Sequence, residues 1–507
     1  MICRVCALAV LAVVLSGAGE SWAAERPGSV DRVIAQVPYD NDIQGLAVTP
    51  DGRVLVGGSF RTFTTPEGWL KAYLPDGTSD TSFGAGGTVG FGSGRGIAAL
   101  AVQPDGRILV GLTGYPTALR RLHPDGSPDT SFGAGGTLDL DFGARDVYAL
   151  TLALQADGRL VVAAVPFDSG DGPHAVHVRR YLANGSPDPS FGSGGETVVA
   201  MLAGGLVATA ALQSDGRIVL VAPGGDSPLR VARLSADGRL DSGFGSGGAA
   251  PIELGRRRWV RQVLPAYGWD WQPLVLPDGR IRIPVTFKVR ELVSSLGLVG
   301  LTANGHPDLR FGRRGLALGP RLDVPEGGEW PRIAVADRHG GIIVVGSTAH
   351  DDLLGGEDAT IVRRFLRSGQ LDRSFGRRGL MRGTLQGGSP FEQELTVLDE
   401  DTVVLAEEVL FARYQSYDGG VVSTIHAGYD RDDPSIALTP GCRSLSVRIT
   451  DLSGIDEVVV RADGRVIRRA HRKRFRTRLP EGARRVSVRA TDLAGNSSTR
   501  RARLPRC

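Results

Sequence analysis

The sequence predicts an all-β protein, because short strand patterns separated by glycine turns recur along most of the chain. Glycine accounts for 71 of the 507 residues, which is typical of a protein with many tight turns. One complete copy of the recurring unit spans residues 99–136. It has two strand patterns around a turn at Asp105-Gly106, a third before Asp125-Gly126, and a Phe132-Gly133 motif that leads into a fourth. We therefore expect short strands and no long helices.

Residues 1–23 are expected to form a signal peptide. Arg4 gives them a basic start, an apolar run follows at residues 6–15, and Ser21 and Ala23 suit cleavage after Ala23. This run is too short to span a bilayer, so we expect a secreted or cell-surface protein with no transmembrane span. A signal anchor is the alternative.

The Asp-Gly turn marks seven units. It occurs at Asp51, Asp105, Asp157, Asp215 and Asp278, in a lengthened form at residues 338–340, and in a decayed form at residues 400–401. The spacing of 52 to 63 residues is too long for one coil of a β-solenoid and leaves room for four short strands in each unit.

The seventh unit lacks its second half, and the N-terminus supplies a matching segment. Residues 28–32 (G-S-V-D-R) are similar to residues 126–130 (G-S-P-D-T). An N-terminal strand that completes the last unit would close a ring and hide both sheet edges. We therefore predict a seven-bladed β-propeller, closed by the N-terminal strand, over residues 25–428. An eight-bladed or split ring is the alternative, because unit five is stretched by an insert at residues 249–272.

The units resemble the delta-60 repeat of exported bacterial proteins. Its pattern, L-Q-x-D-G-[RK]-I-x-V followed by R-L-x-x-D-G-x-x-D-x-S-F-G-x-G-G, is matched closely in units two to four. The resemblance covers about residues 28–415, and units five to seven depart from it progressively. The family has no assigned function, so the resemblance implies a propeller fold but no catalytic residue and no cofactor.

A second, smaller β domain is predicted for residues 435–507, after a linker at residues 429–434. Short strand patterns occur at residues 445–449, 458–462 and 486–490, and the segment D-L-S-G-I-D-E-V-V-V-R-A-D-G-R resembles bacterial immunoglobulin-like modules. The resemblance implies a small β-sandwich.

Cys442 and Cys507 are the only cysteines after the predicted leader, and they bracket the C-terminal domain. An exported protein with two cysteines usually pairs them, so we predict a disulfide between them. Two free thiols are the alternative.

Positive charge is concentrated in the C-terminal domain. Residues 435–507 contain 18 Lys and Arg against 6 Asp and Glu, a net charge of +12, which leaves −8 for the rest of a chain whose total is +4. We expect this domain to bind surface polysaccharide or an anionic wall polymer. We expect no specific nucleic-acid binding, because Phe475 alone interleaves the basic cluster at residues 472–474. An ordinary solvated arginine-rich surface is the alternative.

Two charged residues recur from unit to unit and are expected to brace the fold. The aspartates are Asp80, Asp129, Asp188, Asp241, Asp308 and Asp372, and the arginines are Arg121, Arg180, Arg233, Arg364 and Arg413. We expect a salt bridge between them within each unit, although Ala72 and Gly300 replace the arginine in units one and five. We expect no metal site, because one regular carboxylate per unit does not make a calcium site and because His174 and His177 are placed on opposite strand faces.

The variable connections are the predicted ligand-binding face. Successive connections in an antiparallel blade alternate between two faces, so the second and fourth connections share one. These connections carry Arg257, Trp259, Tyr267, Trp269 and Trp271 in the insert, and Asp351 and Asp352 further on. Flat aromatics beside charged groups suit a sugar chain. The alternative is that Trp259 and Trp269 only cap the fifth unit.

The sequence contains no motif for nucleophilic, zinc or phosphoryl-transfer chemistry. We therefore expect a monomeric binding or scaffold protein that acts at the cell surface or outside the cell, with carbohydrate as the candidate ligand. One alternative is an extracellular enzyme that acts on a polysaccharide or a lactone-type metabolite through carboxylates or histidines at the propeller mouth. Another is a purely structural surface protein.

Overall fold

The computed structural model consists of β-strands, with one short 3-10 helix, η1 (Ala200–Leu202), in the described residues. The structure describes residues 30–505 except 38–40, 61–65, 144–145, 168–174, 203–208, 225–226, 253–261, 266–271, 291–292, 320–326, 338–339, 351–359, 377–378, 384–388, 398–401, 412–415, 427–434, 442, 451–454 and 493–496. The predicted signal peptide, the linker, Cys442 and Cys507 lie outside this part. No helix within it is long and apolar enough to cross a membrane.

Hydrogen bonds in the described residues join the strands into six four-stranded sheets, one nine-stranded sheet and one three-stranded sheet. In units one to four, each sheet contains four consecutive antiparallel strands, as in a propeller blade. The strands of units one and two are β2 (Asn41–Val48), β3 (Val54–Phe60), β4 (Glu67–Tyr73), β5 (Thr88–Ser93), β6 (Ile97–Val102), β7 (Ile108–Leu112), β8 (Ala118–Leu122) and β9 (Thr137–Asp139). Those of units three and four are β10 (Asp146–Leu154), β11 (Leu160–Phe167), β12 (Val176–Tyr181), β13 (Glu196–Val199), β14 (Thr209–Leu212), β15 (Ile218–Gly224), β16 (Ser227–Leu234) and β17 (Ala249–Pro251).

The nine-stranded sheet combines units five and six. Its strands are β18 (Gln262–Pro265), β19 (Leu274–Val275), β20 (Ile281–Arg290), β21 (Val293–Leu301), β22 (Leu316–Leu318), β23 (Gly327–Ala336), β24 (Ile342–His350), β25 (Thr360–Phe365) and β26 (Leu380–Gly383). One parallel pair, Val293 with Gly327, joins β21 to β23, and the other pairings are antiparallel. The two units are therefore separate antiparallel sheets whose strands are joined by this one parallel pair.

The predicted insert at residues 249–272 is not one loop. Ala249–Pro251 is β17, the fourth strand of unit four. Two short strands pair with the same side of β20: β19 with residues 281–282, and β18 with residues 285–288. This part of the prediction was wrong, because β17 completes the sheet of unit four and β18 adds to the sheet of unit five.

The N-terminal strand joins the sheet of unit seven, as the sequence predicts. The order is β1 (Val30–Val37), β29 (Ser416–His426), β28 (Thr402–Phe411) and β27 (Ser389–Val397), and Val33 pairs with Ser423. From the sequence we also expect residues 411–414 to pair in this sheet. Phe411 is the last residue of β28, residues 412–414 lie outside the described part, and the next strand in this sheet is β29. Unit seven has no turn motif to mark this position.

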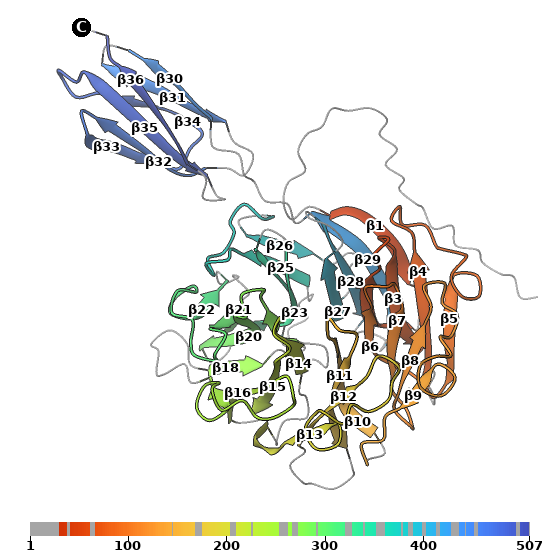
Figure 1. Ribbon diagram of the computed structural model, residues 1–507. Coiled ribbons are helices and arrows are strands. Elements are labelled where there is room, and N and C mark those ends of the chain that lie inside the picture. The colour runs from red at the N-terminus through yellow and green to blue at the C-terminus, as the bar shows by residue number, and fades with distance from the viewer. Residues whose placement is uncertain are drawn as a thin grey trace, which may run out of the picture.

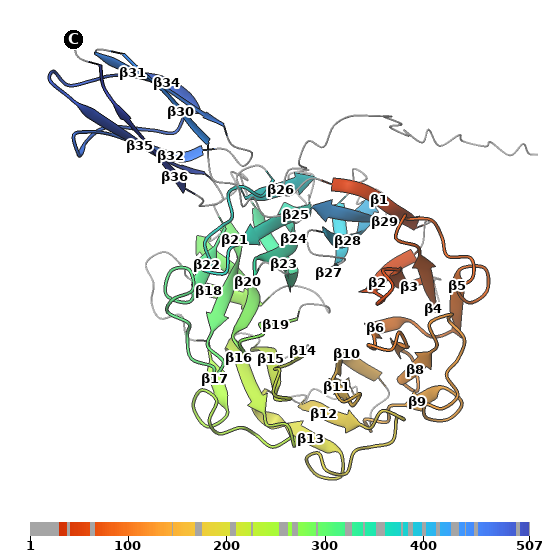
Figure 2. The ribbon, with the colours of Figure 1, turned by 45° about the horizontal axis from the view of Figure 1, so that its top comes forward.

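The sheets follow one another around a common centre (Figures 1 and 2). The first strand of each unit is innermost, and neighbouring innermost strands contact each other in the order β2, β6, β10, β14, β19, β23 and β27, with a further contact between β27 and β2. Apolar clusters fill the space between neighbouring sheets. In one of these clusters Val178 and Phe191 of unit three pack with Ile218 and Leu220 of unit four.

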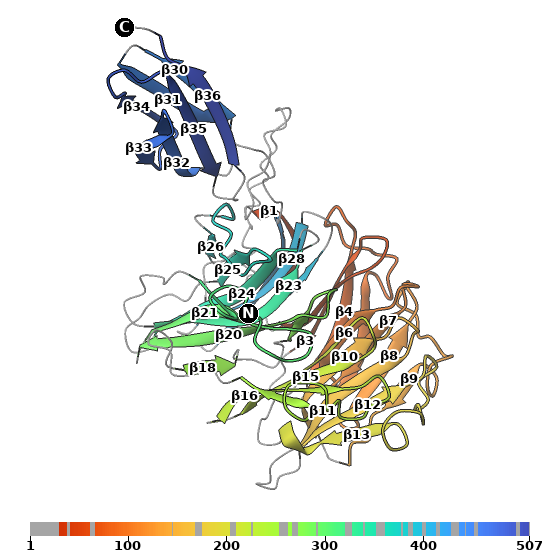
Figure 3. The same ribbon diagram turned by 60° about the vertical axis from the view of Figure 1, so that its left-hand side comes forward.

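The C-terminal strands form two further sheets, which stand apart from the others in Figure 3. One contains β30 (Ser435–Pro440), β31 (Ser444–Thr450) and β34 (Arg474–Arg478). The other contains β33 (Arg465–Ala470), β32 (Ile455–Ala462), β35 (Arg485–Asp492) and β36 (Ser497–Arg503). Leu445 and Val447 of the first share one core with Val458, Val460 and Val488 of the second. The sheets therefore pack face to face.

Candidate functional site

The residues predicted to bind carbohydrate or to form the disulfide all lie outside the described part of the chain. They are Arg257, Trp259, Tyr267, Trp269, Trp271, Asp351, Asp352, Cys442 and Cys507. Their positions remain predictions.

The prediction that second and fourth connections share one face is confirmed where both are described. The Gly94 N–H, in a fourth connection, donates to the Pro66 carbonyl, in a second connection, at 2.8 Å. The Thr113 N–H likewise donates to the Gly96 carbonyl of the preceding unit at 2.8 Å. Variable connections of neighbouring units therefore lie together.

The repeated arginines and aspartates form the predicted salt bridges. Nε of Arg121 lies 2.8 Å from Oδ2 of Asp129, and Nε of Arg180 lies 2.8 Å from Oδ2 of Asp188. The corresponding distance is 2.9 Å for Arg233 and Asp241, and Nη1 of Arg364 lies 3.5 Å from Oδ2 of Asp372. Arg413 lies outside the described residues.

Units without this arginine obtain one from a neighbouring position. In unit one, Nη1 of Arg53 lies 3.1 Å from Oδ2 of Asp80. In unit five, Arg282 pairs directly with Gly300 across β20 and β21, and its Nη2 atom lies 2.9 Å from Oδ2 of Asp308. In unit five the ion pair is therefore retained with an arginine on the partner strand, and the sequence gives no signal for this exchange. In unit one it is made by the arginine after the Asp-Gly turn, whose counterparts in units two to five also lie within 4 Å of the repeated aspartate.

The same arginines also connect each unit to the next, which the sequence interpretation did not foresee. Nη1 of Arg180 donates to the Ala236 carbonyl of unit four, and Nη1 of Arg121 donates to the Ala183 carbonyl of unit three. The Arg180 guanidinium also lies 4.8 Å from the ring centroid of Phe191, which is fully buried. Such a desolvated cation–π contact adds to the ion pair.

The glycines of the repeat fit against this phenylalanine. The Gly192 N–H donates to the Asp237 carbonyl of the next unit at 2.8 Å. Gly238 has φ +86°, and a Cβ atom there would lie 2.8 Å from Phe191 and 2.9 Å from the Gly192 nitrogen. We use the name latch for this group, which comprises Arg180, Asp188, Phe191 and Gly192 of one unit with Asp237 and Gly238 of the next. Its counterparts recur between the other described units that carry the motif.

The electrostatics of the latch suit a structural role. Burial raises the pKa of the Asp129 carboxyl, but hydrogen bonds from Ser131 and the nearby Arg121 guanidinium outweigh this effect and lower the pKa to about 2. The carboxylate therefore stays ionised at neutral pH and is a poor proton donor or acceptor.

The innermost strands line a central channel of about 270 Å³. Apolar side chains include Leu46 of β2, Leu100 of β6 and Leu152 of β10. The polar side chains on the wall are the neutral groups of Gln44, Thr151, Thr209 and Gln272. The described side chains that line the channel include no carboxylate and no histidine.

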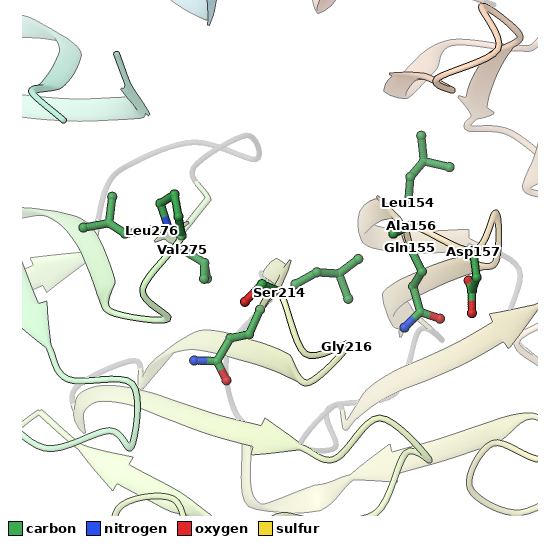
Figure 4. Close-up of a pocket in the computed structure, with 11 residues that line it drawn as sticks. Leu154, Gln155, Ala156, Asp157, Ser214, Gly216, Val275 and Leu276 are labelled. Carbon is green, nitrogen blue, oxygen red and sulfur yellow. The ribbon is translucent and has the colours of Figure 1, made fainter. Parts of the chain in front are cut away.

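A second cavity, of about 480 Å³, lies between the turns that join first and second strands in units three to five (Figure 4). Two of its polar side chains have partners within the fold, whereas Oε1 of Gln155 is buried without a hydrogen-bond partner among the described residues. Nε2 of Gln213 donates to the Gly279 carbonyl at 2.8 Å, and Oδ2 of Asp157 pairs with Nη1 of Arg159 at 3.1 Å. The Gln213 hydrogen bond connects the turns of units four and five at this cavity.

His177 forms a charged cluster that the other units do not repeat. Its Nδ1 atom lies 2.7 Å from Oε1 of Glu196, which also accepts a hydrogen bond from Nε of Arg179 at 3.1 Å. The Arg179 guanidinium lies 4.4 Å from the ring centroid of Phe142 in unit two. His174 lies outside the described residues, within which no group of three or more His, Cys, Asp or Glu could hold a metal ion.

Exposed arginines cover one face of the C-terminal four-stranded sheet. Arg461, Arg485, Arg489, Arg501 and Arg503 are exposed, and they alternate along their strands with residues that turn toward the core. These arginines belong to a different sheet from the basic cluster that the sequence indicated at residues 472–474, which leads into β34.

Five segments of the chain match a protein-family model described as "Domain of unknown function (DUF5122) beta-propeller". The matched segments are residues 49–83, 103–132, 155–191, 213–244 and 340–375. The chain contains DUF5122 β-propeller repeats. Each matched segment runs from an Asp-Gly turn region to the phenylalanine of the Phe-Gly motif, so the DUF5122 repeats supply all residues of the latch except Gly192.

Solved structures with some likeness to the chain include an uncharacterised protein, a secretion component and a lyase. A protein of unknown function from Bacteroides caccae is 14% identical over 68% of this chain and 87% of that chain, with a TM-score of 0.32. PorZ, a surface component of the type-IX secretion system of Porphyromonas gingivalis, is 13% identical over 94% of this chain and 61% of that chain, with a TM-score of 0.38. The polysaccharide lyase Uly1 is 12% identical over 81% and 94%, with a TM-score of 0.44. At these TM-scores the likenesses do not bear on what this chain binds, and no curated protein matches it.

Proposed function

We propose that this chain is an exported binding protein, built as a seven-bladed β-propeller that is closed by its N-terminal strand and followed by an immunoglobulin-like β-sandwich. Closure is supported by the pairing of β1 with β29 and by the contact of β27 with β2. The sandwich is supported by the core that the two C-terminal sheets share.

The latch is the observation that carries the proposal. The repeated aspartate binds the arginine within its unit, and the arginine, phenylalanine and glycines contact the neighbouring unit, so the repeat builds a rigid scaffold. We therefore expect the ligand to bind to the non-repeated connections, because loops on a rigid scaffold often carry the binding residues. The alternative is an extracellular enzyme with carboxylates or histidines at the propeller mouth.

Carbohydrate is the ligand class that we propose for these connections. The segment between β17 and β19 carries Trp259, Tyr267, Trp269 and Trp271 with Arg257, and the segment after β24 carries Asp351 and Asp352. Aromatic rings stack on the apolar faces of sugars, and charged side chains bind their hydroxyl groups.

Binding of the full chain to a panel of immobilised glycans tests the proposal. We expect at least one glycan to be retained, and we expect the triple variant Trp259→Ala, Trp269→Ala, Trp271→Ala to bind it about tenfold or more weakly. Leu309→Ala is the control, because Leu309 is 68% exposed in the third connection of unit five, on the face opposite the second and fourth connections. Retention of no glycan, or equal retention by the triple variant, would contradict the proposal. Release of shortened glycans would favour the enzyme alternative.

A further inference from the structure

The C-terminal four-stranded sheet has one apolar face and one cationic face. Its buried positions are Val458, Val460, Val486, Val488 and Ala490. The alternate positions carry Arg461 on β32, Arg485 and Arg489 on β35, and Arg501 and Arg503 on β36. We call these five residues the arginine face.

Strand register places these cations side by side. Arg485 lies directly opposite Arg503, while Arg461 and Arg501 flank Ser487 from its two neighbouring strands. Facing positions are about 5 Å apart, and like charges directly opposite each other destabilise a sheet. An external anion that lay across these strands would relieve this repulsion.

Carboxylates within the described residues do not neutralise the arginine face. Glu457 pairs with Arg469, which is on β33. The Asp463 carboxylate accepts the backbone N–H groups of Arg484, at 3.1 Å, and Arg485, at 2.9 Å, which holds it at the end of the sheet. None of the five arginine-face side chains forms an ion pair with a described carboxylate, so their charge is available to a ligand.

A hollow of about 850 Å³ lies at one end of the arginine face. Arg461, Arg485, Arg501 and Arg503 line it together with Arg484, and Asp463 is the carboxylate in its wall. Several guanidinium groups therefore converge on one concave surface.

We propose that the arginine face binds a linear acidic polysaccharide. This inference rests on the proposed function, because surface polysaccharide is accessible to an exported protein. Guanidinium groups bind carboxylate and sulfate oxygens in pairs, and a chain with acidic groups on successive sugars contacts several arginines at once. The arginine face contains no aromatic side chain, so it lacks the stacking platform on which single-stranded nucleic acid depends.

The three-stranded sheet supplies a matched control. It also carries exposed arginines, and Arg448 lies opposite Arg474. Nε and Nη2 of Arg476 donate to Oγ of Ser444 at 3.1 and 2.8 Å, as Nη2 of Arg489 on the arginine face donates to Oγ of Ser497 at 3.0 Å. The arginine-face variant is Arg461→Gln, Arg501→Gln, Arg503→Gln. The control variant is Arg474→Gln, Arg476→Gln, Arg478→Gln. Each removes three positive charges from exposed strand positions. The two triple variants therefore differ in the face that they alter.

Binding of the full chain is measured to polygalacturonate, dextran sulfate, neutral dextran and poly(dT), at low and at high salt. We expect binding to at least one of the two acidic polysaccharides, no binding to dextran, and weaker binding as salt rises. Neutralising three residues of the arginine face should weaken binding about tenfold or more, whereas the control variant should weaken it less than about threefold. Both variants change exposed side chains, so we expect unchanged circular dichroism and thermal unfolding.

Three outcomes overturn the inference. They are failure to bind either acidic polysaccharide, equal weakening by the two triple variants, and tighter binding of poly(dT) than of both polysaccharides. The tryptophan variants in the insert separate this inference from the proposed function, because they test the propeller connections and leave the arginine face intact.

Discussion

Replacing Arg180 by alanine is expected to destabilise the propeller by about 3–5 kcal/mol, the usual cost of removing one partner from a buried ion pair. Arg180 and Asp188 are each 4% exposed at the side chain. The variant also loses the hydrogen bonds to Oγ of Ser190 and to the Ala236 carbonyl of the next unit, and the contact with Phe191. Denaturant unfolding followed by tryptophan fluorescence measures the effect on the propeller, because residues 435–507 contain no tryptophan.

Arg159→Ala is the matched control for this experiment. Its Nε atom lies 3.4 Å from the same Asp188 carboxylate, but its side chain is 40% exposed. Exposed ion pairs contribute little, so we expect a loss of less than about 1 kcal/mol. Equal destabilisation by the two variants would show that the buried position of Arg180 in the latch does not matter.

Replacing Gly238 by alanine is expected to lower stability by about 2–4 kcal/mol through backbone strain and overpacking. The residue has φ +86°, and the added Cβ atom would lie 2.8 Å from the Phe191 ring and 2.9 Å from the Gly192 nitrogen. That nitrogen donates to the Asp237 carbonyl, so relief of the clash would stretch the hydrogen bond between units three and four. The same fluorescence-detected unfolding measures the change.

Gly247→Ala separates strain from crowding. Gly247 has φ +65° in the same repeat, but a Cβ atom there would have no neighbour within 4 Å. We expect it to cost only the left-handed strain, about 1 kcal/mol. A loss for Gly247→Ala as large as that for Gly238→Ala would mean that contact with the next unit contributes nothing.

The repeat could be read from the sequence because its glycines report local geometry. Gly126 and Gly238 both have positive φ, which their place in the Asp-Gly motif indicates, and the Phe-Gly motif marks the entry into a fourth strand. Those signals located the turns and most strands of units one to six. Unit seven lacks the second motif, which is why β29 was missed.

Contacts that depend on strand register or on the neighbouring unit could not be predicted. Nothing in the sequence places Arg282 opposite Gly300, because that pairing follows from how β20 and β21 align. The same holds for Arg485 opposite Arg503, which comes from β35 and β36. In β34 and β36 many positions are arginine, so the alternation of apolar and polar residues that marks a strand is weak. These two strands were therefore missed.

The predicted carbohydrate site stays a prediction for a different physical reason. Trp259, Trp269 and Trp271 lie in connections whose length and composition do not repeat, so no other unit provides a template for their arrangement. The repeat determines the scaffold, whereas such connections depend on contacts specific to one unit.

Amide hydrogen exchange of the full chain, resolved to peptides within β1 and β29, tests most directly whether the N-terminal strand closes the propeller ring. Val33 pairs with Ser423 in the antiparallel register of these strands, and paired amides exchange slowly. We expect peptides from Val30–Val37 to be protected as strongly as peptides from Ser416–His426. Exchange of the Val30–Val37 peptides at the rate of an unstructured chain, while β29 stays protected, would contradict closure.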